Sequence, residues 1–168
     1  CRFALFDNRE AISRADIEKG LLEQQFGLEN PIEEWAEDQK WQVAVHEAGH
    51  AVLQYVLLGE ETTIACATIR RRSGALGFIL PVNVEQVYAM PLARIEKDIL
   101  VFLAGQAATI AVSGEPWTGP TGDYVGVLSR IWALYQCGKW GVPLMRDPDK
   151  MGGTMKKRID AYTRRMEK

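Results

Sequence analysis

Two histidines, His46 and His50, stand four residues apart, and Glu47 follows the first of them. Side chains four apart lie on one face of a helix, so both imidazoles can bind the same zinc ion. Glu47 sits beside that face, where it can act as general base toward a water molecule that the metal makes more acidic. The flanking residues are apolar, and burying these polar groups without a partner would be costly. The pattern therefore predicts a zinc-dependent peptidase site rather than a chance match on a solvated helix.

The third protein ligand of such a site must be a carboxylate. The chain has no other histidine and no CxxC pair, and a catalytic zinc normally takes three ligands from protein. The extended HExxHxxGxxH pattern is excluded because Leu53 replaces its glycine and Val56 its histidine. Spacing alone leaves the following candidates open: Glu85, Glu96, Asp98, Glu115 and Asp123.

Composition limits the remaining function classes. The 168 residues carry 20 basic and 22 acidic side chains, a formal charge of -2, which gives no field for attracting nucleic acid, and we expect no such partner. The three widely spaced cysteines (Cys1, Cys66 and Cys137) favour a reducing compartment. No apolar run reaches the roughly 20 residues that span a bilayer, so we expect the chain itself to be soluble. It begins at Cys1 without methionine, which suggests a piece of something longer.

Periodicity and breakers predict where the motif lies. Ser13 and Asp16 resemble the cap of an amphipathic helix that carries Ile17 and Leu21 and ends near Gly27. A boundary follows at residues 30–31. We then expect one long helix over residues 31–58, with Pro31 in its first turn and the zinc motif inside it.

The residues after the motif predict a hairpin and further helices. Strand-forming residues fill 62–71 and 75–80, and helical patterns cover 91–113, 123–136 and about 154–166, with loops at 114–122 and 143–153. The predicted fold is therefore mainly α (α+β), with a small β-hairpin or sheet after the motif helix.

Four ordered segments resemble one family, the membrane-bound AAA+ zinc metalloproteases of the FtsH type. Residues 43–52 (VAVHEAGHAV) are similar to its peptidase motif, and residues 74–78 (GALGF) to its Ala-Leu-Gly-aromatic strand. Residues 103–108 (LAGQAA) resemble its Gly-Gly-Arg-Ala-Ala segment, and residues 118–123 (TGPTGD) its Thr-Gly-Ala-Ser-Asn-Asp segment. Residues 12–20 resemble the end of its ATPase lid. The resemblance implies a lid-like helical segment over 1–29 and a helical, zincin-like zinc metallopeptidase domain over 30–168.

The resemblance also implies ligands, partners and location. In that family the aspartate closing the Thr-Gly segment is the third zinc ligand, which in this chain is Asp123, with one Zn²⁺ per chain. Relatives are ATP-driven hexamers that degrade unfolded or membrane proteins at the cytoplasmic or organelle-interior face of a membrane. This chain has no Gly-x-x-x-x-Gly-Lys-Ser/Thr loop, so ATP would act only through an upstream AAA+ ATPase domain that the chain does not contain.

Departures from the family pattern leave two alternatives. Gln106 replaces an arginine, Thr109 and Ile110 replace acidic residues, and Pro120 and Gly122 alter the segment before Asp123. One alternative is a catalytically impaired pseudo-peptidase that acts as a scaffold or interaction module. The other is a stand-alone metallopeptidase without an ATPase.

Three further features have both a functional and a structural interpretation. The predicted strand through Gly74, Ala75, Leu76, Gly77 and Phe78 can bind an extended substrate by backbone pairing if it lies at a sheet edge, and the alternative is ordinary sheet structure. The run of arginines at 70–72 is expected to be solvated surface. Trp117, Trp132, Tyr135 and Trp140 are expected to be core residues more often than a substrate or subunit surface.

Overall fold

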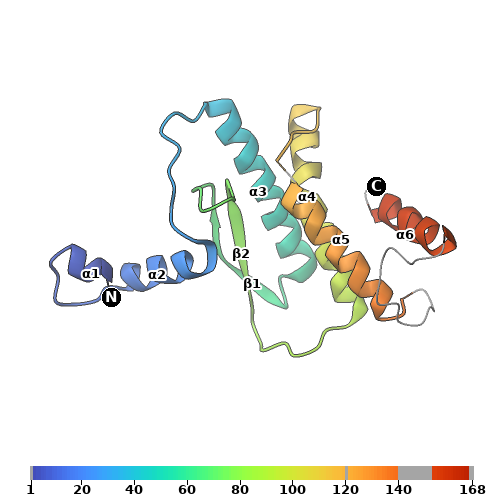
Figure 1. Ribbon diagram of the computed structural model, residues 1–168, viewed down its shortest axis with the longest axis horizontal. Coiled ribbons are helices and arrows are strands. Elements are labelled where there is room, and N and C mark those ends of the chain that lie inside the picture. The colour runs from blue at the N-terminus through green and yellow to red at the C-terminus, as the bar shows by residue number, and fades with distance from the viewer. Residues whose placement is uncertain (1, 120, 140–152, 167–168) are drawn as a thin grey trace.

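Helices form most of this computed structural model, which describes residues 2–119, 121–139 and 153–166 (Figure 1). In chain order the elements are α1 (Arg2–Phe6), α2 (Arg14–Phe26), α3 (Glu37–Leu58), β1 (Thr62–Thr68), β2 (Phe78–Asn83), α4 (Leu92–Ser113), α5 (Thr121–Gln136) and α6 (Gly153–Met166). The predicted class, mainly α with a small antiparallel sheet after the motif helix, is confirmed. Trp140, Pro120 and most of the predicted loop at 143–153 lie outside the described residues.

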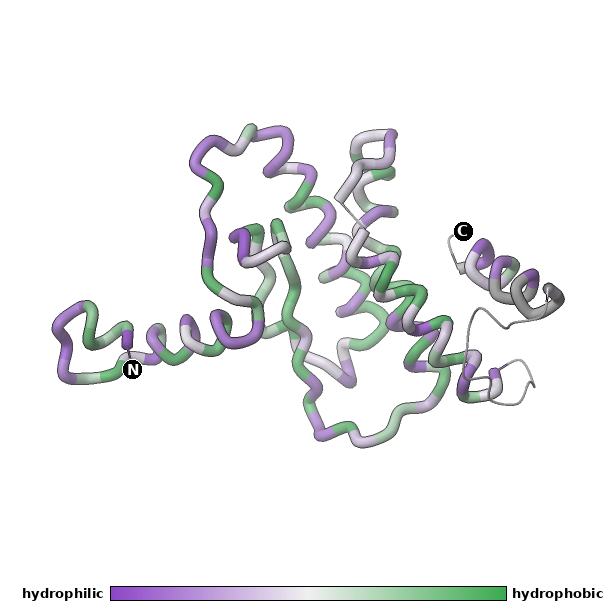
Figure 2. The backbone as a smooth tube through the Cα atoms, in the orientation of Figure 1, coloured by the Kyte–Doolittle hydropathy of each residue, from purple (hydrophilic) through white to green (hydrophobic). Residues whose placement is uncertain are grey.

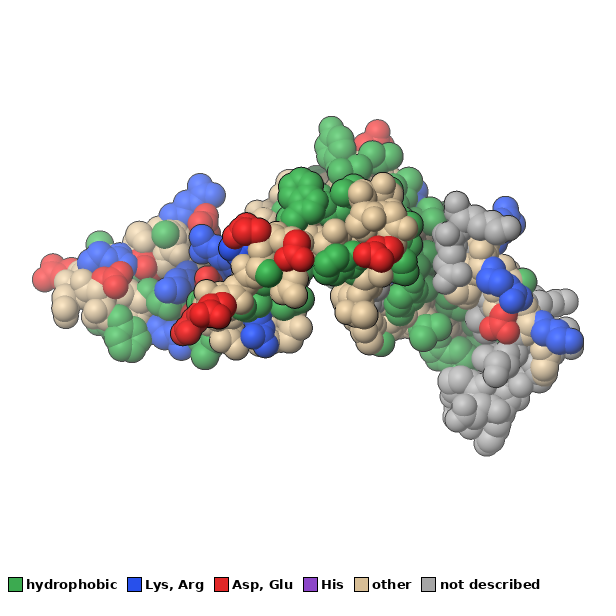
Figure 3. All heavy atoms as spheres, turned by 90° about the horizontal axis from the view of Figure 1, so that it is seen from above, with side chains coloured by type: hydrophobic (Ala, Val, Ile, Leu, Met, Phe, Trp, Pro, Cys, Tyr) green, Lys and Arg blue, Asp and Glu red, His purple; other side chains and the backbone are tan. Residues whose placement is uncertain are grey.

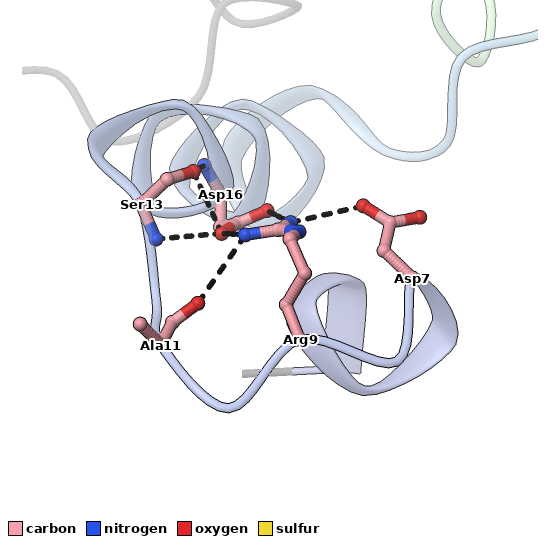
Figure 4. Close-up of polar contacts among 5 residues, drawn as sticks. All are labelled: Asp7, Arg9, Ala11, Ser13 and Asp16. Carbon is pink, nitrogen blue, oxygen red and sulfur yellow. Dashed lines mark hydrogen bonds and ion pairs between the residues drawn. The ribbon is translucent and has the colours of Figure 1, made fainter.

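Helix α2 begins and ends where its sequence predicts. Ser13 caps it, and a capping box joins Ser13 and Asp16 in both directions. The Arg9 guanidinium donates two hydrogen bonds to the Asp16 carboxylate, at 2.8 and 2.6 Å. Figure 4 shows this network around the start of α2. The predicted apolar face is not buried among the described residues, since Ile17 and Leu21 remain 55% and 54% exposed.

Helix α3 begins later than predicted, at Glu37 rather than near Pro31. The reason is backbone pairing with a distant segment. Glu29 forms a β-bridge with Arg72, and the Asn30 N–H donates to the carbonyl of Arg71. The chain after this bridge bends at residues 33–34 and becomes helical only after residue 36. The end of α3 at Leu58, with Gly59 as its cap, is as predicted.

Strands β1 and β2 form the predicted antiparallel hairpin. Their register runs from Thr62 opposite Asn83 to Thr68 opposite Phe78, with a bulge near Ile64. The first strand ends at Thr68 and the second begins at Phe78, so the prediction of strand over residues 69–71 and 75–77 is wrong. Ala75 instead closes a turn through two backbone hydrogen bonds with Arg72, and residues 76–77 connect this turn to β2.

The core lies between α4 and α5. Ile99, Val127, Ile131 and Leu134 are at most 2% exposed and form one cluster. Burying each such side chain contributes about 1.5–3 kcal/mol. Figure 2 shows long hydrophobic stretches in α4 and α5, whereas the first turns of α3 are hydrophilic.

Helix α3 packs closely against α4 along the other side of α4. A Cβ on Gly49 would lie 2.5 Å from the carbonyl oxygen of Ala104 and 2.6 Å from the Cβ of Ala108. Only glycine at this position permits such an approach of the two backbones.

The arginine run at 70–72 is not uniformly solvated. Arg70 is exposed, but Arg72 is only 4% exposed and pairs with Glu29 and the carbonyl of Gly27. The prediction of a solvated surface is therefore wrong for Arg72. Among the described residues, no helix has the length and apolar character needed to cross a membrane.

Candidate metal and catalytic site

Three side chains from two helices converge beside Glu47. His46 and His50 share one face of α3, and their Nε2 atoms are 3.0 Å apart. Asp123, in the first turn of α5, places Oδ2 at 2.9 Å from His46 Nε2 and 3.4 Å from His50 Nε2. The structure thus brings together the two motif histidines and the carboxylate that the family resemblance implied.

Helix α4 orients the second histidine. The Nδ1 of His50 lies 2.7 Å from the backbone carbonyl of Val101, so Nδ1 carries the proton of this bond. The Nε2 of a neutral His50 then offers its lone pair to the cluster. A metal-binding histidine usually donates its other ring N–H to a group such as a backbone carbonyl, which fixes the orientation of the ring.

Gly105 makes room for both rings. A Cβ at this position would lie 2.5 Å from Cε1 of His46 and 2.6 Å from Nε2 of His50. The imidazoles therefore pack directly on the backbone of α4, and any side chain at residue 105 would displace them.

The donor set fits a metal ion. Two ring nitrogens and a carboxylate oxygen meet at 2.9 to 3.4 Å, where their lone pairs repel one another unless a proton or cation lies among them. Ligand atoms about 2 Å from one tetrahedral zinc lie roughly 3.3 Å from one another. Among the residues that the structure describes, His46, His50 and Asp123 are the group of His, Cys, Asp or Glu side chains that could hold a metal ion.

The other carboxylates that spacing left open lie elsewhere. Glu96 accepts hydrogen bonds from Tyr162 and Lys139, and Asp98 pairs with Arg94 on its own helix. Glu85 and Glu115 are exposed. None of these four belongs to the cluster formed by the described residues.

Glu47 is held in a partly buried position next to the cluster. Burial raises its pKa, although the nearby His50 and His46 oppose this shift. A Cβ on Gly77 would lie 2.8 Å from Cγ of Glu47, so the turn before β2 covers this side chain closely. A carboxylate with a raised pKa suits a group that takes up and returns a proton near neutral pH.

Contact between Asp123 and the two histidines favours the ionised form of the carboxylate and the protonated form of His50. Burial alone would raise the pKa of Asp123, but donation from His46 and from the protonated form of His50 lowers it to about 2. Burial opposes the charged form of His50, and its bonds to Asp123 and Val101 nevertheless raise its pKa. Asp123 is therefore ionised and available as an anionic ligand at neutral pH.

The cluster opens into a cleft of about 930 Å³. Residues 74–78 line it beside the motif, although only Phe78 belongs to a strand. Gln106, Thr109 and Trp117 also line the cleft, whereas Ile110 is 42% exposed and does not.

Of the aromatic residues expected in the core, Tyr135 is 1% exposed and stacks against Trp132, as expected. Trp117 instead lines the cleft.

The sequence does not predict two residues that support the site, Val101 and Gly105. The Val101 carbonyl is a backbone group and leaves no signature, so nothing in the residue types could have identified it. Gly105 lies inside the segment that resembled a family motif, but its role follows only from the packing of α3 on α4.

Comparison with known proteins agrees with this geometry. The model of Peptidase family M41 matches residues 33–141. The chain is 30% identical over 116 residues to the ATP-dependent zinc metalloprotease FtsH of Methylococcus capsulatus, covering 69% of this chain and 18% of that protein. The ATP-dependent zinc metalloprotease FtsH 3 of Petrotoga mobilis is 33% identical over 112 residues, covering 67% and 17%. The FtsH of Rickettsia bellii is 28% identical over 159 residues, covering 94% and 24%.

The chain spans roughly a fifth of the length of these relatives. The family match includes α3 to α5 and therefore every residue of the cluster. The chain belongs to peptidase family M41 and represents an FtsH-type peptidase domain.

Proposed function

We propose that this chain is the zinc metalloendopeptidase domain of an ATP-dependent, FtsH-like protease. His46, His50 and Asp123 serve as the zinc ligands and Glu47 as the catalytic base. The observation that carries the proposal is the convergence of these ligands, within 3.4 Å of one another, beside a partly buried glutamate in an open cleft.

Each group has a defined task in peptide hydrolysis. A zinc ion on the three ligands would polarise the scissile carbonyl and increase the acidity of the attacking water. Glu47 accepts a proton from that water and donates it to the leaving amine nitrogen, so that one peptide and one water yield an acid and an amine. Val101 and Gly105 keep the rings in place, the first through its carbonyl and the second by having no side chain.

The cleft suits an extended, unfolded polypeptide. It is lined by residues 74–78, which lead into β2 and approach Glu47 at Gly77. Pairing with a substrate backbone would bind many sequences. Unfolded proteins, including membrane proteins, are therefore the proposed substrates.

We propose that the full-length protein contains an ATPase domain in addition to this peptidase domain. The relatives are named as ATP-dependent, and this chain has no phosphate-binding loop, so we assign ATP hydrolysis to an upstream AAA+ ATPase domain. Residues 1–29 would be the end of its lid and residues 30–168 the peptidase domain. In the family the whole protein is anchored in a membrane with this domain at the cytoplasmic or organelle-interior face, and we propose the same location for this protein.

Self-association into a ring, a hexamer by family resemblance, is supported by the surface. Large apolar side chains are exposed on α3 (Val52, Tyr55 and Val56) and on α5 (Tyr124, Val125 and Leu128). Figure 3 shows hydrophobic side chains gathered over the middle of the molecule, whereas charged ones are interspersed over the α1–α2 end. Exposed apolar residues of this extent are typical of protein interfaces.

The test is substitution of the base. Glu47→Gln should retain zinc and the fold but lower the rate of cleavage of unfolded casein or a flexible peptide by about 100-fold or more, because the proton acceptor is lost. Glu60→Gln, an exposed change after the end of α3, is the matched control and should keep the parental rate.

The outcomes separate the alternatives. Equal cleavage by the Glu47→Gln variant and the parent would show that the assigned base is wrong. A parent that holds one zinc per chain but cleaves nothing, even when joined to its ATPase, would point to a pseudo-peptidase scaffold instead.

A further inference from the structure

The turn between β1 and β2 needs an anchor beyond the hairpin. Strand pairing ends where Thr68 faces Phe78. Ser73, inside the turn, has a φ of 47°, a left-handed conformation that is unfavourable for a residue with a side chain. A turn in this conformation persists only where its surroundings fix it.

The far side of the turn sets the space beside Glu47. A Cβ on Gly77 would lie 2.8 Å from Cγ and 3.0 Å from Oε1 of Glu47, and 2.8 Å from the carbonyl oxygen of Thr68. A small shift of residues 74–78 therefore changes both the cover over Glu47 and the width of the cleft that these residues line.

Arg72 connects this turn to the chain that follows α2. It is 4% exposed, donates from Nη1 to the carbonyl of Gly27 and from Nη2 to Oε2 of Glu29, both at 3.2 Å. Its backbone pairs with Ala75 on one side and forms a bridge with Glu29 on the other. A guanidinium can make this forked contact, and a lysine cannot.

Phe26 provides a second connection. Its ring stacks on that of Phe78, with centroids 3.9 Å apart and planes at 14°. Phe78 is 8% exposed and directly follows Gly77. The Ser73 side chain occupies the space that a Cβ on Gly27 would need, so the two segments also touch between these connections. Figure 1 shows the end of α2 beside the hairpin.

We propose that Arg72 and Phe26 are positioning residues for peptide hydrolysis, because they hold residues 74–78 against Glu47 and so fix the substrate-binding side of the cleft. The inference rests on the proposed function and assigns to residues 26–30 a role in substrate binding. These residues touch neither the metal cluster nor the reacting atoms and act only through the turn.

The kinetic signature is a loss of substrate binding. Arg72→Met and Phe26→Ala should each raise KM for an extended peptide about 10-fold, as expected for loss of a charged hydrogen bond or a stacked, half-buried ring, while kcat changes much less. Arg71→Met, at the neighbouring half-buried arginine, is the matched control and should keep the parental KM. Phe26→Tyr retains the stacked ring and should restore most of the binding that Phe26→Ala loses.

A second measurement needs no turnover. In the Arg72→Met and Phe26→Ala chains, amide hydrogen exchange of residues 73–78 should become faster, while exchange in α3 and the bound zinc per chain stay at parental values. If either variant fails to fold, Glu29→Gln replaces it, because this change weakens the contact with Arg72 but leaves the guanidinium a hydrogen-bond acceptor.

The results decide between two separate failures. Parental KM together with parental exchange at residues 73–78 would overturn the inference, and so would zinc loss in step with the rise in KM. If the parent cleaves no peptide, the proposed function fails, and the exchange comparison alone then decides whether Arg72 and Phe26 position the turn.

Discussion

At the scale of single residues, Asp123 distinguishes this site from a pair of histidines on a helix. The histidine spacing predicts two ligands, and exclusion predicts a carboxylate without selecting one. Asp123 alone among the candidates approaches the rings, because the first turn of α5 directs it toward α3. Its identification from sequence needed the resemblance of residues 118–123 to a known family segment.

Substitution of this aspartate tests the ligand set. Asp123→Asn should reduce zinc affinity and activity together, because it removes the charge of the proposed anionic ligand. Glu96→Gln should leave both nearly unchanged, since Glu96 bonds to Tyr162 and Lys139 instead. Zinc per chain after dialysis against a mild chelator is the measurement. Full zinc in the Asp123 variant with loss in the Glu96 variant would refute the assignment.

Gly105 leads to a prediction about space rather than charge. In Gly105→Ala the new Cβ would collide with His46 and His50, which we expect to lower zinc affinity at least 10-fold and to cost about 1–3 kcal/mol of stability. Gly20→Ala is the matched helical control, because its Cβ would meet only Phe3, at 3.9 Å. Zinc titration and denaturant unfolding of both variants would check this, and unchanged zinc affinity in Gly105→Ala would contradict it.

At the scale of elements, the sequence predicts well what depends on neighbouring residues. The cap of α2 at Ser13, the end of α3 at Leu58 and the hairpin all follow from local patterns. The errors occur where distant segments meet. The start of α3 and the burial of Arg72 depend on a bridge between residues 29 and 72, and neither segment reveals the other.

The α2 cap predicts a pH-dependent contribution to stability. Hydrogen bonds from Arg9 first, and then from Ser13, hold the pKa of Asp16 well below its usual range. Because the folded pKa lies below the unfolded value of about 3.9, the ionised carboxylate stabilises the fold above about pH 4 and loses this effect as the pH falls toward the folded pKa.

Asp16→Asn should therefore be less stable than the parent at neutral pH, with a difference that narrows below about pH 4. Glu18→Gln, which removes only an exposed pair with Arg14, should differ little from the parent at any pH. Denaturant midpoints measured from pH 7 to pH 3 provide the test. A difference for Asp16→Asn that is constant with pH would show that ionisation of this carboxylate is not the source of the stability.

At the scale of the whole molecule, the site lies where α3, α4 and α5 meet. Helices α3, α4 and α5 and the hairpin pack around the cleft, whereas α1 and α2 extend to one side (Figure 1). The apolar core lies between α4 and α5, and α3 contributes to the site from the opposite side of α4. Metal binding should thus stabilise the packing of α3 against α5 across the intervening helix.

Removal of the metal should be visible in thermal unfolding. Zinc chelation should lower the melting temperature of the parent by roughly 10 °C, since each kcal/mol corresponds to about 2–4 °C in a chain of this size. The Asp123→Asn chain should melt at nearly the same temperature with and without chelator. An identical melting temperature for the chelated and zinc-loaded parent would exclude a stabilising metal at this site.

His46 and Asp123 lie 77 positions apart in the chain, so a bound ion would connect two distant points of the sequence. A tether between two such distant points restricts the random walk of the unfolded chain, and a covalent link closing a loop of this length would contribute about 4–5 kcal/mol by entropy alone. A zinc ion that dissociates on unfolding would stabilise instead through its free energy of binding to the folded chain, which increases with the free zinc concentration. The same atoms that would cut other polypeptides thereby act as a removable cross-link of their own chain, so loss of catalysis and loss of resistance to unfolding should follow a single metal-binding curve.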